Sequence, residues 1–178
     1  MLDKFMQISM ELDEKIERSY FFIKGHIDIN CDYFIEKIKR GVEENGNMSH
    51  KTNLEGKMTS WNYFNNDENF RKYIINFNRH MDKNYKLPFY ALEDSWGFIN
   101  SPGDKTKYHS HYKSIYSGVI YLNHCAQPLL FNEIKQKIVP EPGSFAIFSS
   151  WLTHGCDIND TNINKFGISF NMSESNRW

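Results

Sequence analysis

The chain has 178 residues and a formal net charge of −1, with 21 lysines and arginines against 22 aspartates and glutamates. This length fits one domain with a substantial buried core, and an aromatic share of 16% argues against intrinsic disorder. Because neither sign of charge dominates, nothing favours nucleic acid or a membrane surface as a partner. We therefore expect a single domain over residues 1–178.

The three cysteines, Cys31, Cys125 and Cys156, are odd in number and form no closely spaced pair. This pattern argues against a disulfide framework and favours a reducing, cytoplasmic compartment. No apolar run approaches the roughly 18 residues that span a bilayer. The N-terminus also lacks the apolar stretch of a signal peptide.

The N-terminal portion, residues 1–86, is predicted to combine helices with a little β-structure. Residues 1–16 have weak helical patterning, and we expect any homodimer contact to involve them. Residues 20–23 form a short apolar run that is typical of a strand. The substrate pocket is expected to be lined by this portion.

Two later segments of this portion show apolar residues at helical spacing. Residues 31–44 form the first predicted helix, which Gly46 ends. Residues 65–68 resemble a capping box that opens the second. The apolar stripes of the two helices are Phe34, Ile38 and Val42, and Phe70, Tyr73, Phe77 and Met81. We expect both helices to pack on the outside of a sheet.

From residue 87 to 178 the pattern changes to short apolar and β-branched runs separated by turn residues. The eight runs are residues 89–99, 106–111, 115–122, 128–131, 137–139, 144–148, 153–158 and 165–171. So many short strands in a short segment predict a sandwich or a jelly roll. The expected fold is α+β, with a double-stranded β-helix (jelly roll, cupin-like) core and the N-terminal helices outside it.

Three histidines in this region predict a metal site. His109 and His111 are two residues apart, so on a strand they point to the same side. His154 follows a turn and an apolar strand, and the intervening 154 − 109 = 45 residues leave room for several strands. Neutral imidazole is the commonest ligand for iron, zinc, copper and nickel. The alternative is a pair of incidental surface histidines with a core His154 bonded to a backbone carbonyl.

Lys165 and Ser169 are the candidates for binding an anion. They are four residues apart on the last predicted strand and therefore share a face. A cation beside a hydroxyl suits a carboxylate. The alternative for Lys165 is a surface lysine at the start of a strand. Cys156, close to His154, is expected to be a small core residue, and Trp96 to be part of the core or of a pocket wall.

The segment from Trp96 to Asn171, under half of the chain, resembles the 2-oxoglutarate- and Fe(II)-dependent oxygenase family found in phages and marine bacteria. It is more distantly similar to prolyl 4-hydroxylase-type enzymes. The matching pieces agree in order and spacing; they are Trp96–Asn100, Gly103, His109–His111, Ser117–Leu122, Val139–Gly143, Phe148–His154 and Lys165–Asn171.

This resemblance implies a dioxygenase that uses Fe(II) and 2-oxoglutarate and hydroxylates an unidentified small-molecule or peptidyl substrate, releasing succinate and CO2. His109 and His154 would bind the iron. Lys165 would pair with the distal carboxylate of 2-oxoglutarate, where the wider superfamily more often has arginine, and Ser169 would donate a hydrogen bond to the same carboxylate. Lysine is a point charge without the arginine fork.

The sequence differs from the usual pattern of this family at one of the predicted metal-ligand positions. The usual iron site has two histidines and a carboxylate, but His111 occupies the carboxylate position, and no Asp or Glu lies between Asp104 and Glu133. We expect His111 to be the third ligand; otherwise it lies outside the coordination sphere and water completes the site. Two other functions stay open: a three-histidine, cupin-like dioxygenase that does not use 2-oxoglutarate, and a non-catalytic jelly roll that binds a metal or another ligand.

Overall fold

The computed structural model describes residues 19–45 and 52–174. The predicted helical segment 1–16, with its expected dimer contact, lies outside these residues. In chain order the elements are β1 (Phe22–His26), α2 (Cys31–Asn45), β2 (Lys57–Met58), α3 (Glu68–Tyr85), β3 (Tyr90–Asn100), β4 (Thr106–His109), β5 (Tyr116–Tyr121), β6 (Leu129–Phe131), β7 (Gln136–Ile138), β8 (Ser144–Ser149), β9 (His154–Cys156) and β10 (Lys165–Glu174).

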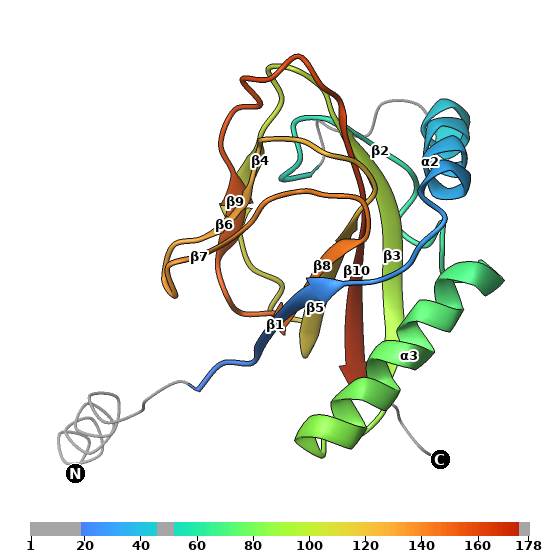
Figure 1. The fold of residues 1–178 in the computed structure, drawn as a ribbon, viewed down its shortest axis with the longest axis vertical. Coiled ribbons are helices and arrows are strands. Elements are labelled where there is room, and N and C mark those ends of the chain that lie inside the picture. The colour runs from blue at the N-terminus through green and yellow to red at the C-terminus, as the bar shows by residue number, and fades with distance from the viewer. Residues whose placement is uncertain (1–18, 46–51, 175–178) are drawn as a thin grey trace, which may run out of the picture.

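Two antiparallel sheets face each other, as Figure 1 shows. One has six strands in the order β1-β8-β5-β10-β3-β2, and the other has four in the order β4-β9-β6-β7. Each of the eight predicted runs overlaps one of the strands β3 to β10. The predicted jelly-roll fold with N-terminal helices is thus confirmed.

The N-terminal portion supplies both edges of the larger sheet. β1 pairs with β8, and β2, which no sequence pattern predicted, pairs with β3. These pairings join strands from both sides of the predicted boundary at residue 87, and the division into two portions itself stays a prediction. Neither of the described helices is long and apolar enough to cross a membrane.

The N-terminus of α3 differs from its prediction by two residues. Asp67 is the N-cap, and its side chain accepts a hydrogen bond of 2.8 Å from the backbone N–H of Phe70. Asn65, the predicted cap, instead accepts a 2.6 Å hydrogen bond from Ser95. Asp67 also bonds to Tyr33 and Lys37 of α2. The tertiary contact to α2 therefore fixes the position of the cap, which a local motif cannot show.

Two hydrophobic cores lie on either side of the six-stranded sheet. The outer one lies beneath α2 and α3 and is rich in aromatic rings; Phe70 and Phe77 of α3 contact Phe170 of β10. The close approach of α2 requires Gly97 on β3, because a Cβ atom there would lie 2.3 Å from Ile38. The inner core lies between the two sheets and includes Phe131 and Phe148.

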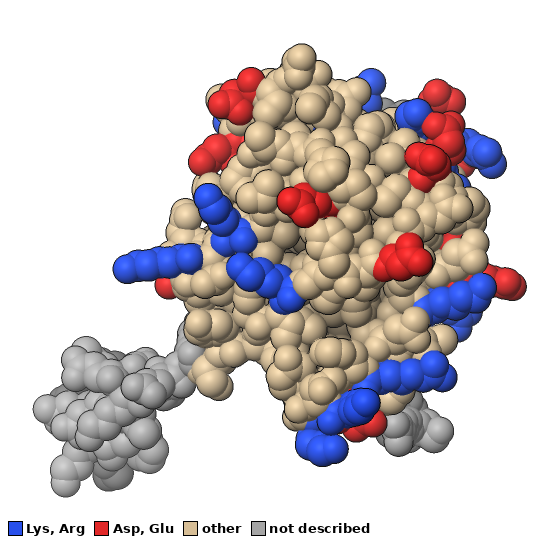
Figure 2. Space-filling model, viewed as in Figure 1, with Lys and Arg blue, Asp and Glu red and all other residues tan. Residues whose placement is uncertain are grey.

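Charged side chains of both signs cover the surface. Figure 2 shows lysine and arginine side chains over α3, and acidic and basic side chains together around α2. No single sign dominates the face in view. The expectation that the chain has no nucleic-acid partner stays a prediction.

Candidate metal centre

The pairing of β4 with β9 brings two of the predicted histidines together. His109 lies directly across from His154 in the antiparallel register. β4 ends at His109, so His111 lies in the following turn and not on the predicted strand. The backbone N–H of His111 donates a 2.7 Å hydrogen bond to the carbonyl of Ser150, the residue after the end of β8.

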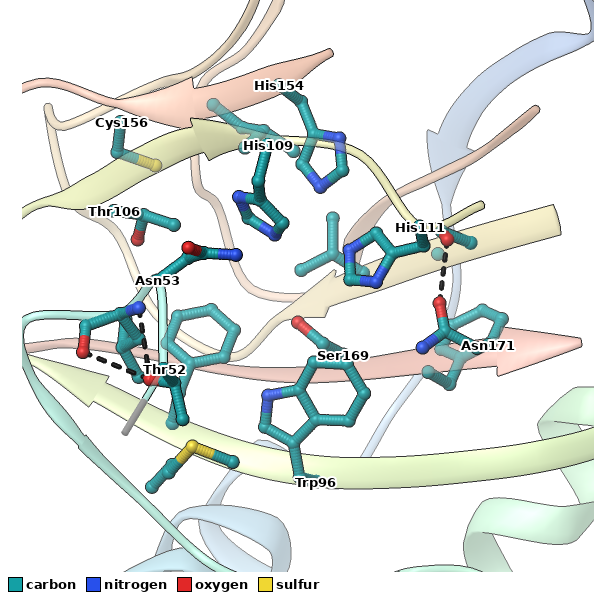
Figure 3. A pocket seen from close by; sticks show the side chains of 18 of the residues that line it. Thr52, Asn53, Trp96, Thr106, His109, His111, His154, Cys156, Ser169 and Asn171 are labelled. Carbon is teal, nitrogen blue, oxygen red and sulfur yellow. Dashed lines mark hydrogen bonds between the residues drawn. The ribbon is translucent and has the colours of Figure 1, made fainter. Parts of the chain in front are cut away.

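The three imidazoles form one cluster. One nitrogen from each of His109, His111 and His154 lies within 4.8 Å of the others. The ring centroids are 4.6 Å apart for His109 and His154, 4.8 Å for His109 and His111, and 5.3 Å for His111 and His154. Figure 3 shows the three rings pointing toward a common space above Trp96 and Ser169.

Two of the rings are oriented by the same local hydrogen bond. Nδ1 of His109 lies 2.7 Å from the carbonyl oxygen of Lys107, and Nδ1 of His154 lies 2.8 Å from that of Leu152. A carbonyl only accepts, so each Nδ1 carries the proton and each Nε2 keeps a free lone pair. Within the described part of the chain, the ring of His111 makes no such hydrogen bond.

Burial keeps the cluster neutral. Burial, reinforced by the neighbouring His109, lowers the pKa of His154 to about 3 and that of His111 to about 4. Burial also lowers the pKa of His109. Neutral imidazole is the form that binds metals. Three neutral nitrogen donors that converge on one space fit a transition metal such as iron or zinc.

The cluster opens into a cavity of about 190 Å³ between the two sheets. Neither Asp nor Glu is among the described residues that line it, so no carboxylate there replaces His111 as a third ligand. As expected, the N-terminal portion contributes part of the wall: Thr52, Asn53, Leu54, Met58 and Trp61. Trp96, predicted to be core or pocket wall, lines the cavity as well.

Lys165 reaches the same cavity from β10. Its side chain is fully buried, which rules out the alternative of a surface lysine. The Nζ atom donates to the Sγ atom of Cys156 at 3.2 Å and to the carbonyl oxygen of Gln127 at 3.4 Å. Among the described residues it has no ion pair. A buried ammonium without a counter-charge is costly, so an anion that entered this cavity would stabilise it.

Ser169 lines the cavity on the same strand as Lys165, as its spacing predicted. Tyr121 of β5 is a site residue that the sequence analysis missed. The centroid of its ring lies 5.8 Å from Nζ of Lys165. Complete burial raises the pKa of Tyr121 well above the ordinary value, so its hydroxyl stays protonated and can donate a hydrogen bond. The spacing of two residues between Val119 and Tyr121 on β5 could have predicted this position, because residues two apart on a strand share a face and both contribute to the inner core.

Trp61 was also missed. It lies in the turn after β2, is 43% exposed and packs edge to face on Trp96, with ring centroids 4.7 Å apart. No periodic pattern marks a residue in such a turn. Trp61 and Trp96 together form an aromatic wall of the cavity, beside His111, whose ring centroid lies 6.4 Å from that of Trp96.

Comparisons with known proteins agree on the fold. No protein-family model and no curated protein matches the sequence. Solved structures do match. The viral collagen prolyl hydroxylase vCPH from Paramecium Bursaria Chlorella virus-1, in complex with 2OG, has a TM-score of 0.66 at 17% identity, covering 89% of this chain and 97% of that one. A Pseudomonas putida prolyl-4-hydroxylase has a TM-score of 0.65 at 13% identity, covering 88% and 94%.

The carbocyclase SnoK from nogalamycin biosynthesis, a non-heme alpha ketoglutarate dependent enzyme, also matches, with a TM-score of 0.65 at 10% identity, covering 88% of this chain and 80% of that one. The fold is therefore that of the 2-oxoglutarate- and Fe(II)-dependent oxygenases, with prolyl 4-hydroxylase-like proteins among its structural neighbours. The resemblance predicted from the segment Trp96–Asn171 is confirmed at this level.

Proposed function

We propose that the protein is an Fe(II)- and 2-oxoglutarate-dependent dioxygenase that hydroxylates a C–H bond of its substrate and releases succinate and CO2. One observation carries this proposal. A cluster of three neutral imidazoles and a buried lysine without a counter-charge share one cavity, in a fold whose solved neighbours are 2-oxoglutarate oxygenases.

His109, His111 and His154 would hold the iron through ring nitrogens that face the cavity. When bound together, ferrous iron and 2-oxoglutarate would supply the oxidising chemistry, in which one oxygen atom of O2 enters succinate and the other enters the hydroxylated product. Three neutral ligands leave the site with one more positive charge than two histidines and a carboxylate do. This extra charge favours a dianionic co-substrate.

Lys165 would bind the distal carboxylate of 2-oxoglutarate. Because the ammonium is a point charge, it fixes the position of the carboxylate less strictly than an arginine fork does. The hydroxyl groups of Ser169 and Tyr121 line the same cavity and would donate hydrogen bonds to this carboxylate. The aromatic wall formed by Trp61 and Trp96 is left to contact the substrate and to exclude water.

The substrate class stays open between small molecules and peptidyl groups. The structural neighbours include a collagen prolyl hydroxylase and an enzyme of nogalamycin biosynthesis, so this fold accommodates both kinds.

Anaerobic titration of the metal-free protein with Fe(II) and then 2-oxoglutarate tests the proposal. We expect a weak visible metal-to-ligand charge-transfer band, followed by succinate formation when dioxygen is admitted. His154→Ala is expected to abolish metal binding, and Lys165→Ala to weaken 2-oxoglutarate binding while iron still binds. The absence of both the band and succinate would disprove the assignment.

A second function is favoured by the three-histidine donor set. A cupin-like dioxygenase with three histidines binds its organic substrate directly to iron and needs no 2-oxoglutarate. Oxygen uptake that does not depend on 2-oxoglutarate would identify it. Zinc retained in untagged protein, together with no oxygen uptake, would instead indicate a non-catalytic binding module.

A further inference from the structure

Cys156 lies in the proposed co-substrate cavity without a role in the proposed reaction. It belongs to β9, two residues after His154, and its thiol lines the cavity (Figure 3). The side chain is only 4% exposed. Its Sγ atom lies 3.2 Å from Nζ of Lys165, which is within contact distance. The same Nζ atom also donates to the carbonyl oxygen of Gln127 at 3.4 Å.

This contact differs from that of the other buried cysteine. Cys125 lies 3.9 Å from the amide oxygen of Asn159 and 3.8 Å from the hydroxyl of Thr161. Neither of these is an amine. Among the described residues all three cysteines are free, so no disulfide occupies the thiol of Cys156. Of the three, Cys156 alone lines the metal-site cavity, which dioxygen must enter if the protein is an oxygenase.

We propose that Cys156 and Lys165 are a modification site, at which dioxygen joins them through a covalent Sγ–O–Nζ bridge. The S–H bond and one N–H bond break, and an S–O and an O–N bond form. One oxygen atom of O2 enters the bridge, and the other leaves as water with the two hydrogens. Sulfur and nitrogen each lose two electrons, and the two oxygen atoms together gain four. A thiol reductant reverses the bridge to thiol, amine and water.

The consequence for activity depends on the proposed function. A bridged Lys165 has no ammonium to pair with a carboxylate, so oxidation would switch off 2-oxoglutarate binding. A bound co-substrate would in turn compete for Lys165 and protect it. The bridge would therefore inactivate the enzyme when oxygen is present and 2-oxoglutarate is scarce.

Intact-mass spectrometry of metal-free, fully reduced protein tests the bridge without relying on activity. One sample is kept anaerobic and the other is aerated, both with a chelator present. We expect the aerated protein to gain one oxygen atom and lose two hydrogen atoms, and to return to its original mass with a thiol reductant. An unchanged mass, or the gain of oxygen alone, would overturn the proposal, as would the loss of two hydrogens without oxygen, which indicates a disulfide.

Trypsin digestion locates the bridge in the same samples. No Lys or Arg lies between Lys137 and Lys165, so the reduced protein yields separate peptides 138–165 and 166–177. A bridged Lys165 resists cleavage, so we expect a single peptide 138–177 after aeration. Normal cleavage at Lys165 in aerated protein would contradict the bridge.

Two matched variants complete the experiment. Cys156→Ser should lose the mass change, and Cys125→Ser, which also removes a buried thiol, should retain it. A mass change that persists in Cys156→Ser would overturn the proposal. Aeration with added Fe(II) and 2-oxoglutarate then tests protection. A bridge that forms equally with and without them would contradict the proposed co-substrate role of Lys165 and leave the bridge itself established.

Discussion

The two sides of the six-stranded sheet differ in what they bury. The outer side, beneath α2 and α3, is filled with aromatic and aliphatic side chains such as Phe34, Phe70 and Phe170. The inner side, facing β4 and β9, encloses a cavity that contains histidines and the unpaired Lys165. The outer core contributes apolar burial and stability, while the inner cavity buries polar groups whose desolvation reduces stability.

The largest expected effect on stability is in the outer core. Phe70 is fully buried and its ring contacts those of Phe34, Phe64 and Phe170. Phe70→Ala should lower the free energy of unfolding by about 3–5 kcal/mol, because it leaves a cavity. Chemical denaturation measures this. Tyr112→Ala, at a side chain that is 82% exposed, is the control and should change stability by less than about 0.5 kcal/mol.

The histidines of the inner cavity should make the metal-free protein sensitive to acid. Burial lowers the pKa of His154 from 6.5 to about 3, so the unfolded chain takes up a proton at mildly acidic pH while the folded one does not. The contribution of the neutral His154 to the free energy of unfolding is therefore fully present above the unfolded pKa, and it is lost as the pH falls from 6.5 toward 3. Between pH 7 and pH 5 we expect the free energy of unfolding to fall by on the order of 2 kcal/mol because of His154.

Denaturation curves of the metal-free protein at the two pH values measure this loss, and His154→Gln should reduce it. Equal pH dependence in the variant and the parent would show that His154 is not the group responsible.

Lys165→Met should separate stability from binding. Replacing an unpaired buried ammonium by an apolar side chain of similar length is expected to raise the free energy of unfolding by about 1–3 kcal/mol. The same change should abolish the high-affinity binding of 2-oxoglutarate. Thermal unfolding and calorimetric titration of the iron-loaded protein, kept anaerobic, measure the two effects. A variant that is less stable than its parent would show that the contacts of Lys165 with Gln127 and Cys156 stabilise the fold by more than the burial of its charge costs.

Ser169→Ala should have the smallest effect on stability. The loss of one hydrogen bond to a charged carboxylate is expected to weaken 2-oxoglutarate binding by roughly 1.5–3 kcal/mol at most. We expect no measurable effect on folding, because the Ser169 side chain makes no hydrogen bond that the fold depends on among the described residues. Ser173→Ala, on the same strand but outside the cavity, is the control. Equal affinities of the two variants for 2-oxoglutarate would show that Ser169 does not contribute to its binding.

The sequence predicts the parts of this molecule that local patterns encode. The strands β3 to β10 follow from alternation and turn residues, and the spacing of His109, His111 and His154 anticipates their cluster. The positions set by tertiary contacts were not predicted. Asp67 caps α3 because it bonds to α2, and Trp61 reaches the cavity from a turn with no periodic pattern.

The burial of Lys165 was likewise beyond the sequence pattern. A lysine at the start of a strand has the same local signal whether it faces solvent or the cavity. What decides its environment is the position of Gln127 and Cys156, which lie 38 and 9 residues away in the chain. Contacts between strands, and not propensity, make this residue part of the site.

Hydrogen bonds to backbone carbonyls orient the rings of His109 and His154, and they distinguish these two members of the histidine cluster from His111. Each of these two rings is held by the backbone carbonyl two residues before it, at Lys107 and at Leu152. His111 lies in a turn and lacks such a bond among the described residues. Among the three histidines, His111 is therefore the one whose replacement would break no such orienting hydrogen bond. In the proposed iron site, the substitution His111→Asp would give the usual set of two histidines and a carboxylate, and the hydrogen bonds that orient His109 and His154 would be kept.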